Sequence, residues 1–287
     1  SRLRQRGRRK DFDEGIIGYF QTNGDFDVKV RVDSLQPVHR YAKTGLLVRE
    51  NLTTTSRMVS LFATPTGPTE LPPDQPTGED TVEFNFRRAA YDGSNNIGLG
   101  SPGYPNAWLR LARRGNIIYG LIGHDGTNWI VSGSVDTATW PAGAFKSATY
   151  LGIGSSSHDD TRLVASELRQ FSPVTQVGPL QIIQQPAPGF GLAGSAVSFS
   201  VTVNDPVDAR YQWFANDIAI PRGTNATFTT TSLSSTNDAA RYKVTVTGPN
   251  GAITSNEALL SVVAIDAPEN PDILFDFDDG EIPLGAR

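Results

Sequence analysis

The sequence contains no cysteine. This absence excludes disulfide bridges, thiolate metal sites, iron–sulfur clusters and cysteine nucleophiles, although it assigns no cellular compartment. Histidine is also scarce, with three residues in the whole chain. No apolar run approaches the roughly 18 residues that a membrane-spanning helix requires, so we expect no membrane insertion.

The beginning of the chain lacks two features of a newly made secretory precursor. Residue 1 is a serine rather than a methionine, and no apolar signal-peptide core follows it. We therefore expect a processed or excised piece of a longer protein.

What the chain does contain is typical of β-structure. Its 287 residues suggest two domains at roughly 150 residues each, and its 28 glycines and 19 prolines favour many strands and turns. Residues 26–32 alternate apolar and charged side chains, the pattern of a half-buried strand, and residues 82–87 and 108–113 repeat it. No segment of the first 172 residues keeps a helical period. The sequence therefore predicts an all-β fold.

Changes in composition divide the chain along its length. The stretches 64–81 and 91–106 are rich in loop-forming residues and are predicted to be long loops. A short segment with proline, glycine and valine has the composition of a linker between domains. The predicted organisation is a first domain at 1–172, a linker at 173–179, a second domain at 180–265 and an acidic tail at 266–287.

The second domain has the pattern of an immunoglobulin-like sandwich, with about seven short strands predicted in a row. Trp213 stands where such folds place the core tryptophan of strand C. Residues 238–244 match the strand-F pattern D-x-A-x-Y-x-C, with Tyr242 as the tyrosine corner. Val244 replaces the strand-F cysteine, and Val201 is the expected replacement for its partner. The domain resembles bacterial immunoglobulin-like domains, which implies a cysteine-free sandwich and indicates no chemistry.

Five motifs follow one another in the first domain, at 24–32, 43–50, 108–113, 125–129 and 151–158. In this order they resemble the concanavalin-A/laminin-G-like jelly rolls of large bacterial secreted proteins. The resemblance implies a jelly-roll sandwich with an extracellular accessory role, beside glycoside hydrolases or in giant surface proteins. Residues 273–280 look like the opening strand of a further laminin-G-like module.

The sequence offers no catalytic arrangement. Concanavalin-like glycosidases carry carboxylates at a spacing such as E-x-D-x-E, because an acid and a nucleophile must flank one bond. Residues 10–172 contain no such spacing. Residues 157–159 read Ser-His-Asp, but the members of a catalytic triad normally come from separate elements. We predict that the chain is not an enzyme and requires no cofactor.

A structural calcium ion stays open as an alternative. This cation takes about six to eight oxygen ligands, which loop carboxylates and carbonyls supply. The competing interpretation, which we favour, is that the acidic side chains are solvated. The candidate ligands are Asp25 and Asp27, Asp159 and Asp160, or Asp11, Asp13 and Glu14.

Sugar binding needs exposed aromatic rings beside polar side chains. Trp140, which precedes a proline, and Tyr91 and Tyr104, in the second long loop, are the candidates for an exposed stacking platform. Trp108 alternates with two leucines and is expected to be partly core. The competing interpretation is that these rings pack under the loops.

The two ends of the chain carry opposite charge. Residues 1–10 sum to +6 and residues 266–287 to −6, in a chain whose net charge is −5. Because the chain beyond the basic end is acidic, and no aromatic residue interleaves with that end, we expect no nucleic-acid partner. If copies of the chain join, these ends are complementary surfaces for a head-to-tail contact that salt weakens.

Together these features predict non-catalytic structural or adhesive modules of an extracellular or cell-surface bacterial protein. The expected partners are a glycan or surface matrix, or further copies of the chain. The alternative is a carbohydrate-binding accessory module of a polysaccharide-degrading enzyme.

Overall fold

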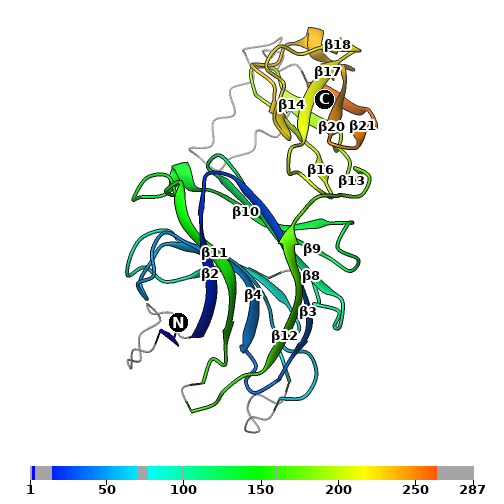
Figure 1. Ribbon diagram of the computed structural model, residues 1–287. Coiled ribbons are helices and arrows are strands. Elements are labelled where there is room, and N and C mark those ends of the chain that lie inside the picture. The colour runs from blue at the N-terminus through cyan, green and yellow to red at the C-terminus, as the bar shows by residue number, and fades with distance from the viewer. Residues whose placement is uncertain (1, 4–14, 70–76, 99, 160, 264–287) are drawn as a thin grey trace, which may run out of the picture.

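The computed structural model describes residues 2–3, 15–69, 77–98, 100–159 and 161–263 (Figure 1). These residues form two β-sandwiches that follow one another along the chain, which confirms the predicted all-β fold. The helices among them are two three-residue 3₁₀ turns, η1 (Thr137–Thr139) and η2 (Ser235–Asn237). No helix in the described part of the chain is long and apolar enough to cross a bilayer.

The first sandwich consists of two antiparallel sheets packed face to face. The seven-stranded sheet runs, in spatial order, β1 (Arg2–Leu3), β2 (Gly15–Asn23), β11 (Ala148–Ser156), β4 (Lys43–Arg49), β5 (Met58–Ala63), β6 (Val82–Arg87) and β7 (Asn95–Gly98). The five-stranded sheet runs β10 (Ile130–Asp136), β9 (Ile117–Gly123), β8 (Ala107–Arg114), β3 (Phe26–Leu35) and β12 (Ser166–Pro173).

Period-two alternation explains how the two sheets face each other. In β3 the side chains of Phe26, Val28 and Val30 enter the core, while the charged residues between them point outward. Strand β8 is different, because it is buried along almost its whole length. Leu109 and Leu111 face the core, and the outward side chains of this strand are covered by the second sandwich.

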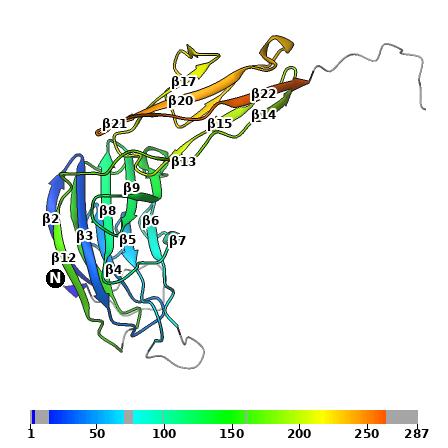
Figure 2. The same ribbon diagram turned by 90° about the vertical axis from the view of Figure 1, so that its right-hand side faces the viewer.

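The second sandwich contains the remaining strands, and Figure 2 shows it lying across one end of the first. Its main sheet runs β14 (Gly189–Leu192), β22 (Ala258–Val263), β20 (Arg241–Gly248), β17 (Arg210–Ala215) and β18 (Ile218–Ala219), with β21 (Gly251–Thr254) also on β20. Two further pairs are β13 (Ile182–Gln184) with β16 (Thr202–Val203), and β15 (Ser198–Ser200) with β19 (Thr227–Thr229).

The core of the second sandwich agrees with the immunoglobulin-like pattern. Trp213 is fully buried and its indole Nε1 donates to the carbonyl of Asn225 at 2.9 Å. Tyr242 stacks on Phe199 with 4.5 Å between the ring centroids. Val201 and Val244, at the expected cysteine positions, both lie in this core. A packed apolar core therefore stands where a disulfide is common in this fold.

Strands β2 and β7 are two of the strands that the sequence does not predict, and β14 and β21 are others. Residues 91–106 are predicted to be a loop, but they contain β7, which pairs with β6 from Glu83↔Gly98 to Phe86↔Asn95. The sequence predicts no strand at residues 15–23, but the structure has β2 there, and it pairs with β11 over eight residues. Backbone hydrogen bonds to a neighbouring strand hold both segments, and neither segment has the alternating pattern that reveals a strand in sequence.

Candidate functional site

A hollow of about 220 Å³ lies on the outer face of the seven-stranded sheet. Strands β2, β4, β5, β6 and β11 contribute to it. Gly154 of β11 lies in its lining, where the absence of a side chain leaves space, since a Cβ at this position would meet the side chain of Leu47 at 3.2 Å. The polar side chains that line the hollow are those of Lys43, Arg49, Ser60, Asn85, Arg87, Ser94, Ser155, Ser156 and His158.

Two buried arginines support the loops around this hollow. Arg49 Nε donates to the carbonyl of Asn51 at 3.3 Å. Arg87 Nη1 donates to the carbonyls of Thr54 and Ser56, each at 3.1 Å. The hydroxyl of Ser60, on β5, is also buried and has no hydrogen-bond partner among the described residues. A ligand in the hollow is the natural partner for this hydroxyl, since buried polar groups are usually hydrogen-bonded.

Two tyrosines extend the same face of the sheet. Tyr150, on β11, is the register partner of Arg49, which lines the hollow. Tyr19, on β2, pairs with Gly152 of β11. Gly152 pairs on its other side with Leu47, which also lines the hollow. The two rings meet edge to face, with centroids 5.4 Å apart, and Tyr19 is 40% exposed. The pair therefore offers an aromatic surface next to polar side chains, the combination that sugar binding requires.

Lys43 and His158, which line the hollow, belong to a group of titratable side chains. We call this group the end cluster: His39, Lys43, Glu79, Glu83 and His158. Lys43 Nζ lies 2.7 Å from Glu83 Oε2, and Glu83 is only 3% exposed. The imidazole rings of His39 and His158 stack obliquely, with centroids 4.7 Å apart. Burial, together with the nearby Lys43 ammonium and His39, lowers the pKa of His158 to about 4. The imidazole of His158 is therefore neutral at physiological pH.

The second candidate is the joint between the two sandwiches, which is centred on Arg110 of β8. Its Nε and Nη2 atoms donate to the two carboxylate oxygens of Asp27, each at 2.8 Å. Its Nη1 donates to Asp205 Oδ2, in the second sandwich, at 2.6 Å. Arg110 is 2% exposed, and although burial opposes its charge, the two carboxylates outweigh that effect and raise the pKa of the guanidinium. One buried cation thus binds acids of both domains.

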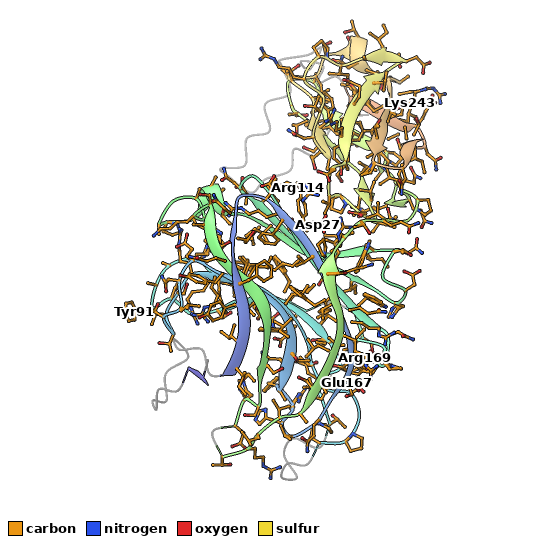
Figure 3. The ribbon with its side chains drawn as sticks, viewed as in Figure 1. Asp27, Tyr91, Arg114, Glu167, Arg169 and Lys243 are labelled. Atoms are coloured by element: carbon orange, nitrogen blue, oxygen red, sulfur yellow. The ribbon has the colours of Figure 1, made fainter. Side chains whose placement is uncertain are left out.

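Apolar and polar contacts surround this ion pair. Val207, three residues before β17, packs into a cluster with Trp108 and Trp129 on the outer face of the five-stranded sheet. Arg114 donates to both carboxylate oxygens of Asp208 at 2.7 Å, and Figure 3 shows Arg114 and Asp27 at the end of the first sandwich that lies nearest the second. We call these residues, together with Arg110 and Asp205, the joint.

The motif at 125–129 shapes the turn beside the joint. The Asp125 carboxylate accepts the backbone N–H groups of Thr127 at 2.8 Å and Asn128 at 2.7 Å. These and further hydrogen bonds from Asn128 and Thr127 hold the pKa of Asp125 well below its usual range. The carbonyl of Thr127 then accepts the N–H of Gly178 at 2.7 Å. The turn therefore fixes the path of the linker.

The expected exposure of Trp140 is wrong. This side chain is 5% exposed and stacks on Phe86, with 6.3 Å between the ring centroids, and meets Phe145 edge to face at 5.7 Å. The 3₁₀ turn η1 directs the chain inward, because the N–H of Trp140 donates to the carbonyl of Thr137. A ring packed in this way cannot serve as a stacking platform.

The two candidate tyrosines lie in different environments. Tyr104 is half-buried against the first core, its hydroxyl donates to the carbonyl of Thr64 at 2.8 Å, and burial raises its pKa. Its ring is therefore partly committed to packing, in line with the competing interpretation. Tyr91 is 71% exposed and projects from the edge of the first sandwich (Figure 3). Sequence reasoning did not single out Tyr19 or Tyr150, which long-range strand pairing brings together.

The arrangement at Asp25 and Asp27 does not fit a calcium site. Asp27 is paired with Arg110 and Arg114, and Asp25 accepts the N–H of Gly115 at 2.7 Å. Asp159 accepts the N–H and hydroxyl of Thr161 at 2.8 and 2.7 Å. The part of the chain that the structure describes contains no group of three or more His, Asp or Glu side chains able to hold a metal. The predictions for Asp160, Asp11, Asp13 and Glu14 fall outside the described residues.

Comparison with known proteins yields only distant structural similarity. No family model and no curated protein matches the chain. A functionally unknown protein from Saccharomyces cerevisiae matches with a TM-score of 0.40 and 13% identity, over 58% of this chain and 77% of that one. The first domain of Duf (Kirre) matches with a TM-score of 0.26 and 20% identity, over 30% of this chain and 98% of that one. Tandem immunoglobulin repeats of Dlar match with a TM-score of 0.27 and 15% identity, over 52% and 88%. At these values the matches carry no inference about function.

Proposed function

We propose that the chain is a non-catalytic structural or adhesive unit in which two β-sandwiches are held at a fixed relative orientation. The observation that carries this proposal is the joint, where the buried Arg110 binds Asp27 of its own domain and Asp205 of the other. A buried cation with two partners resists separation, because parting the domains would leave a charge without compensation in a low-dielectric environment. A unit of this kind suits a spacer that presents a surface at a set distance and angle.

Residual dipolar couplings test this proposal directly. If the unit is rigid, backbone amides of both sandwiches fit one alignment tensor. Two independent tensors would contradict it.

The proposed setting is the surface or exterior of a bacterial cell, where such units bind a surface matrix or one another. Head-to-tail association of copies of the chain is also part of this proposal, because residues 1–10 and residues 266–287 carry opposite charge. Apart from residues 2–3, both ends lie outside the described residues. The proposal for self-association therefore depends on charge alone.

A second candidate function is carbohydrate binding by the first sandwich, as an accessory module of a polysaccharide-degrading enzyme. The observation that favours it is the exposed edge-to-face pair of Tyr19 and Tyr150 beside the polar hollow with its unpartnered Ser60 hydroxyl. A glycan array probed with the whole chain tests this function. Binding that is lost in Tyr150→Ala supports it, and the absence of binding to every glycan contradicts it.

A further inference from the structure

Residues 77–81 form an arm that returns the chain from the long loop to β6. Within the loop, Gly78 N–H donates to the carbonyl of Gly67 at 2.7 Å and Asp80 N–H to that of Pro65 at 3.0 Å. The N–H of Glu79 instead donates to the carbonyl of Arg40, at 3.3 Å, in the segment before β4. Glu79 is thus the residue through which this arm contacts a second loop.

The side chain of Glu79 reaches the carboxylate of Glu83 and is hydrogen-bonded to it. Glu83 is fixed by Lys43, at 2.7 Å, and by Asn85, whose Nδ2 donates to Glu83 Oε2 at 3.0 Å. The Oε2 atom of Glu79 is buried and has no hydrogen-bond donor among the described residues. A hydrogen bond between two carboxyl groups requires a proton, because two carboxylates offer only acceptors.

Other charged and titratable groups lie near this pair, and Lys43, Arg40 and His158 act on it directly. Arg40, His39 and Tyr41 come from the segment before β4, and Lys43 from β4 itself. His158 and Asp159 follow β11, and Asp80, on the arm, accepts the hydroxyl of Ser101 at 2.7 Å. Lys43 and Arg40 favour ionisation of Glu79, but Lys43 is already bound to Glu83.

We propose that Glu79 and Glu83 form a pH-sensitive latch, in which one shared proton holds the arm 77–81 against β4 and β6 and loss of that proton to solvent releases it. The proton leaves the carboxyl group of Glu79, and the two negative charges that remain repel each other across a short distance. Release frees the Glu79 side chain to reach water and weakens the contact between its N–H and Arg40.

The position of the pair places the transition near neutral pH. Burial and the contact with Glu83 raise the pKa of Glu79 to about 7. Burial also opposes ionisation of Glu83, but Lys43 outweighs it and lowers the pKa of Glu83. The proton therefore stays on Glu79, and Glu83 stays ionised. Because Lys43 and His158 of the end cluster line the hollow, the latch lies at the end of the candidate binding face.

Hydrogen exchange of the whole chain between pH 5.5 and 8.5 tests the latch. The rates for the amides of residues 78–81 are divided by the rates of an unstructured peptide at each pH. We expect their protection to fall about tenfold across this range. This figure is smaller than the full shift of the Glu79 pKa from 4.5 to about 7 would give, because Glu79 is only partly buried. The protection of β17 and β20 should stay constant.

Three variants make the test decisive. Glu79→Gln keeps a donor for Glu83 but cannot ionise, so protection of the arm should be independent of pH. Glu83→Gln removes the like charge, so the pKa of Glu79 should fall and the pH-dependent release of the arm should disappear. Glu167→Gln, an exposed glutamate on β12, should behave as the unmodified chain. An unchanged pH profile in Glu79→Gln would overturn the latch.

If Glu79→Gln fails to fold, infrared spectroscopy of the unmodified chain with ¹³C-labelled glutamate replaces it. A protonated glutamate band that persists above pH 5.5 and disappears around pH 7 is expected. Its absence at pH 5.5 would also overturn the proposal. Neither readout depends on a ligand, so either result is independent of the proposed function.

Discussion

Arg110 of the first sandwich forms an ion pair with Asp205 of the second, with 2.6 Å between Nη1 and Oδ2. The same guanidinium is bound through its other two nitrogens to Asp27, on the adjacent strand. The pair is therefore both a contact between domains and part of the packing of one domain. Removing one acid leaves a buried cation with half of its compensation, which is more costly than removing an exposed pair.

Asp205→Ala is expected to loosen the joint. Loss of this acid should lower the free energy of unfolding by about 2 kcal/mol or more, the usual penalty for leaving a buried charge unpaired. Urea denaturation followed by tryptophan fluorescence measures it, since Trp108 and Trp129 lie in the joint. The control is Asp217→Asn, which removes the charge of the exposed partner of Lys243 and should cause no measurable change, because asparagine tolerates the positive φ of this residue. Equal stability of both variants would argue against an energetic role for the joint.

Trp140→Ala is expected to destabilise the first sandwich and not to act through ligand binding. Removing a buried ring from the contact with Phe86 and Phe145 should cost about 3–5 kcal/mol. Differential scanning calorimetry of the whole chain should show an earlier transition for the first sandwich and little change in the second. If the variant keeps its melting temperature but loses glycan binding, Trp140 is an exposed binding residue and this prediction is wrong.

Tyr19→Ala and Tyr150→Ala are expected to weaken binding of any glycan that the first sandwich recognises. Loss of one stacking ring should reduce affinity about tenfold, equivalent to about 1.4 kcal/mol. Isothermal titration with the strongest array ligand measures this effect. Phe190→Ala, an exposed aromatic side chain on the second sandwich, is the control and should bind normally. Tyr91→Ala, tested alongside, decides whether that exposed ring belongs to the same surface.

Two residues of the end cluster, His158 and Glu79, are expected to make the free energy of unfolding depend on pH in opposite directions. The pKa of His158 falls from 6.5 to about 4 on folding, so its contribution is present above pH 6.5 and is lost as pH falls toward 4. The pKa of Glu79 rises from 4.5 to about 7, so its contribution is present below pH 4.5 and is lost as pH rises toward 7. The two effects oppose each other between pH 4.5 and 6.5.

Melting temperatures of variants separate these contributions. Relative to the unmodified chain, His158→Gln should gain stability below pH 5, and Glu79→Gln should gain it above pH 7. Identical pH profiles in all three proteins would show that neither group titrates as its surroundings indicate.

Head-to-tail association is expected to depend strongly on salt. If the ends with charges of +6 and −6 meet, sedimentation at 20 mM salt should show oligomers that dissociate at 500 mM, because screening shortens the range of these charges to a few ångströms. A chain truncated to residues 15–263 should stay monomeric at both concentrations. Oligomers of the truncated chain, or oligomers insensitive to salt, would exclude the charged ends as the contact.

Local pattern was sufficient for strands such as β3 and insufficient for the site. The alternation in β3 placed Phe26 and Val28 in the core, because one strand carries the whole signal. Tyr19 and Tyr150 come together through the pairing of β2 with β11, which no local pattern reveals. Asp27 is of a residue type that often binds metals, but its arginine partners lie more than 80 residues away in the sequence, so no local pattern reveals them. The exposure of Trp140 was misjudged because its neighbours in sequence are polar or small, whereas its neighbours in space are aromatic.

A distance measurement between the two sandwiches tests the rigid joint most directly. Because the chain has no cysteine, Glu167→Cys on β12 and Ile218→Cys on β18, both exposed, accept spin labels at two sites only. Double electron–electron resonance should give one narrow distance distribution, which broadens when Asp205→Ala is added. A broad distribution in the chain that retains Asp205 would contradict the account.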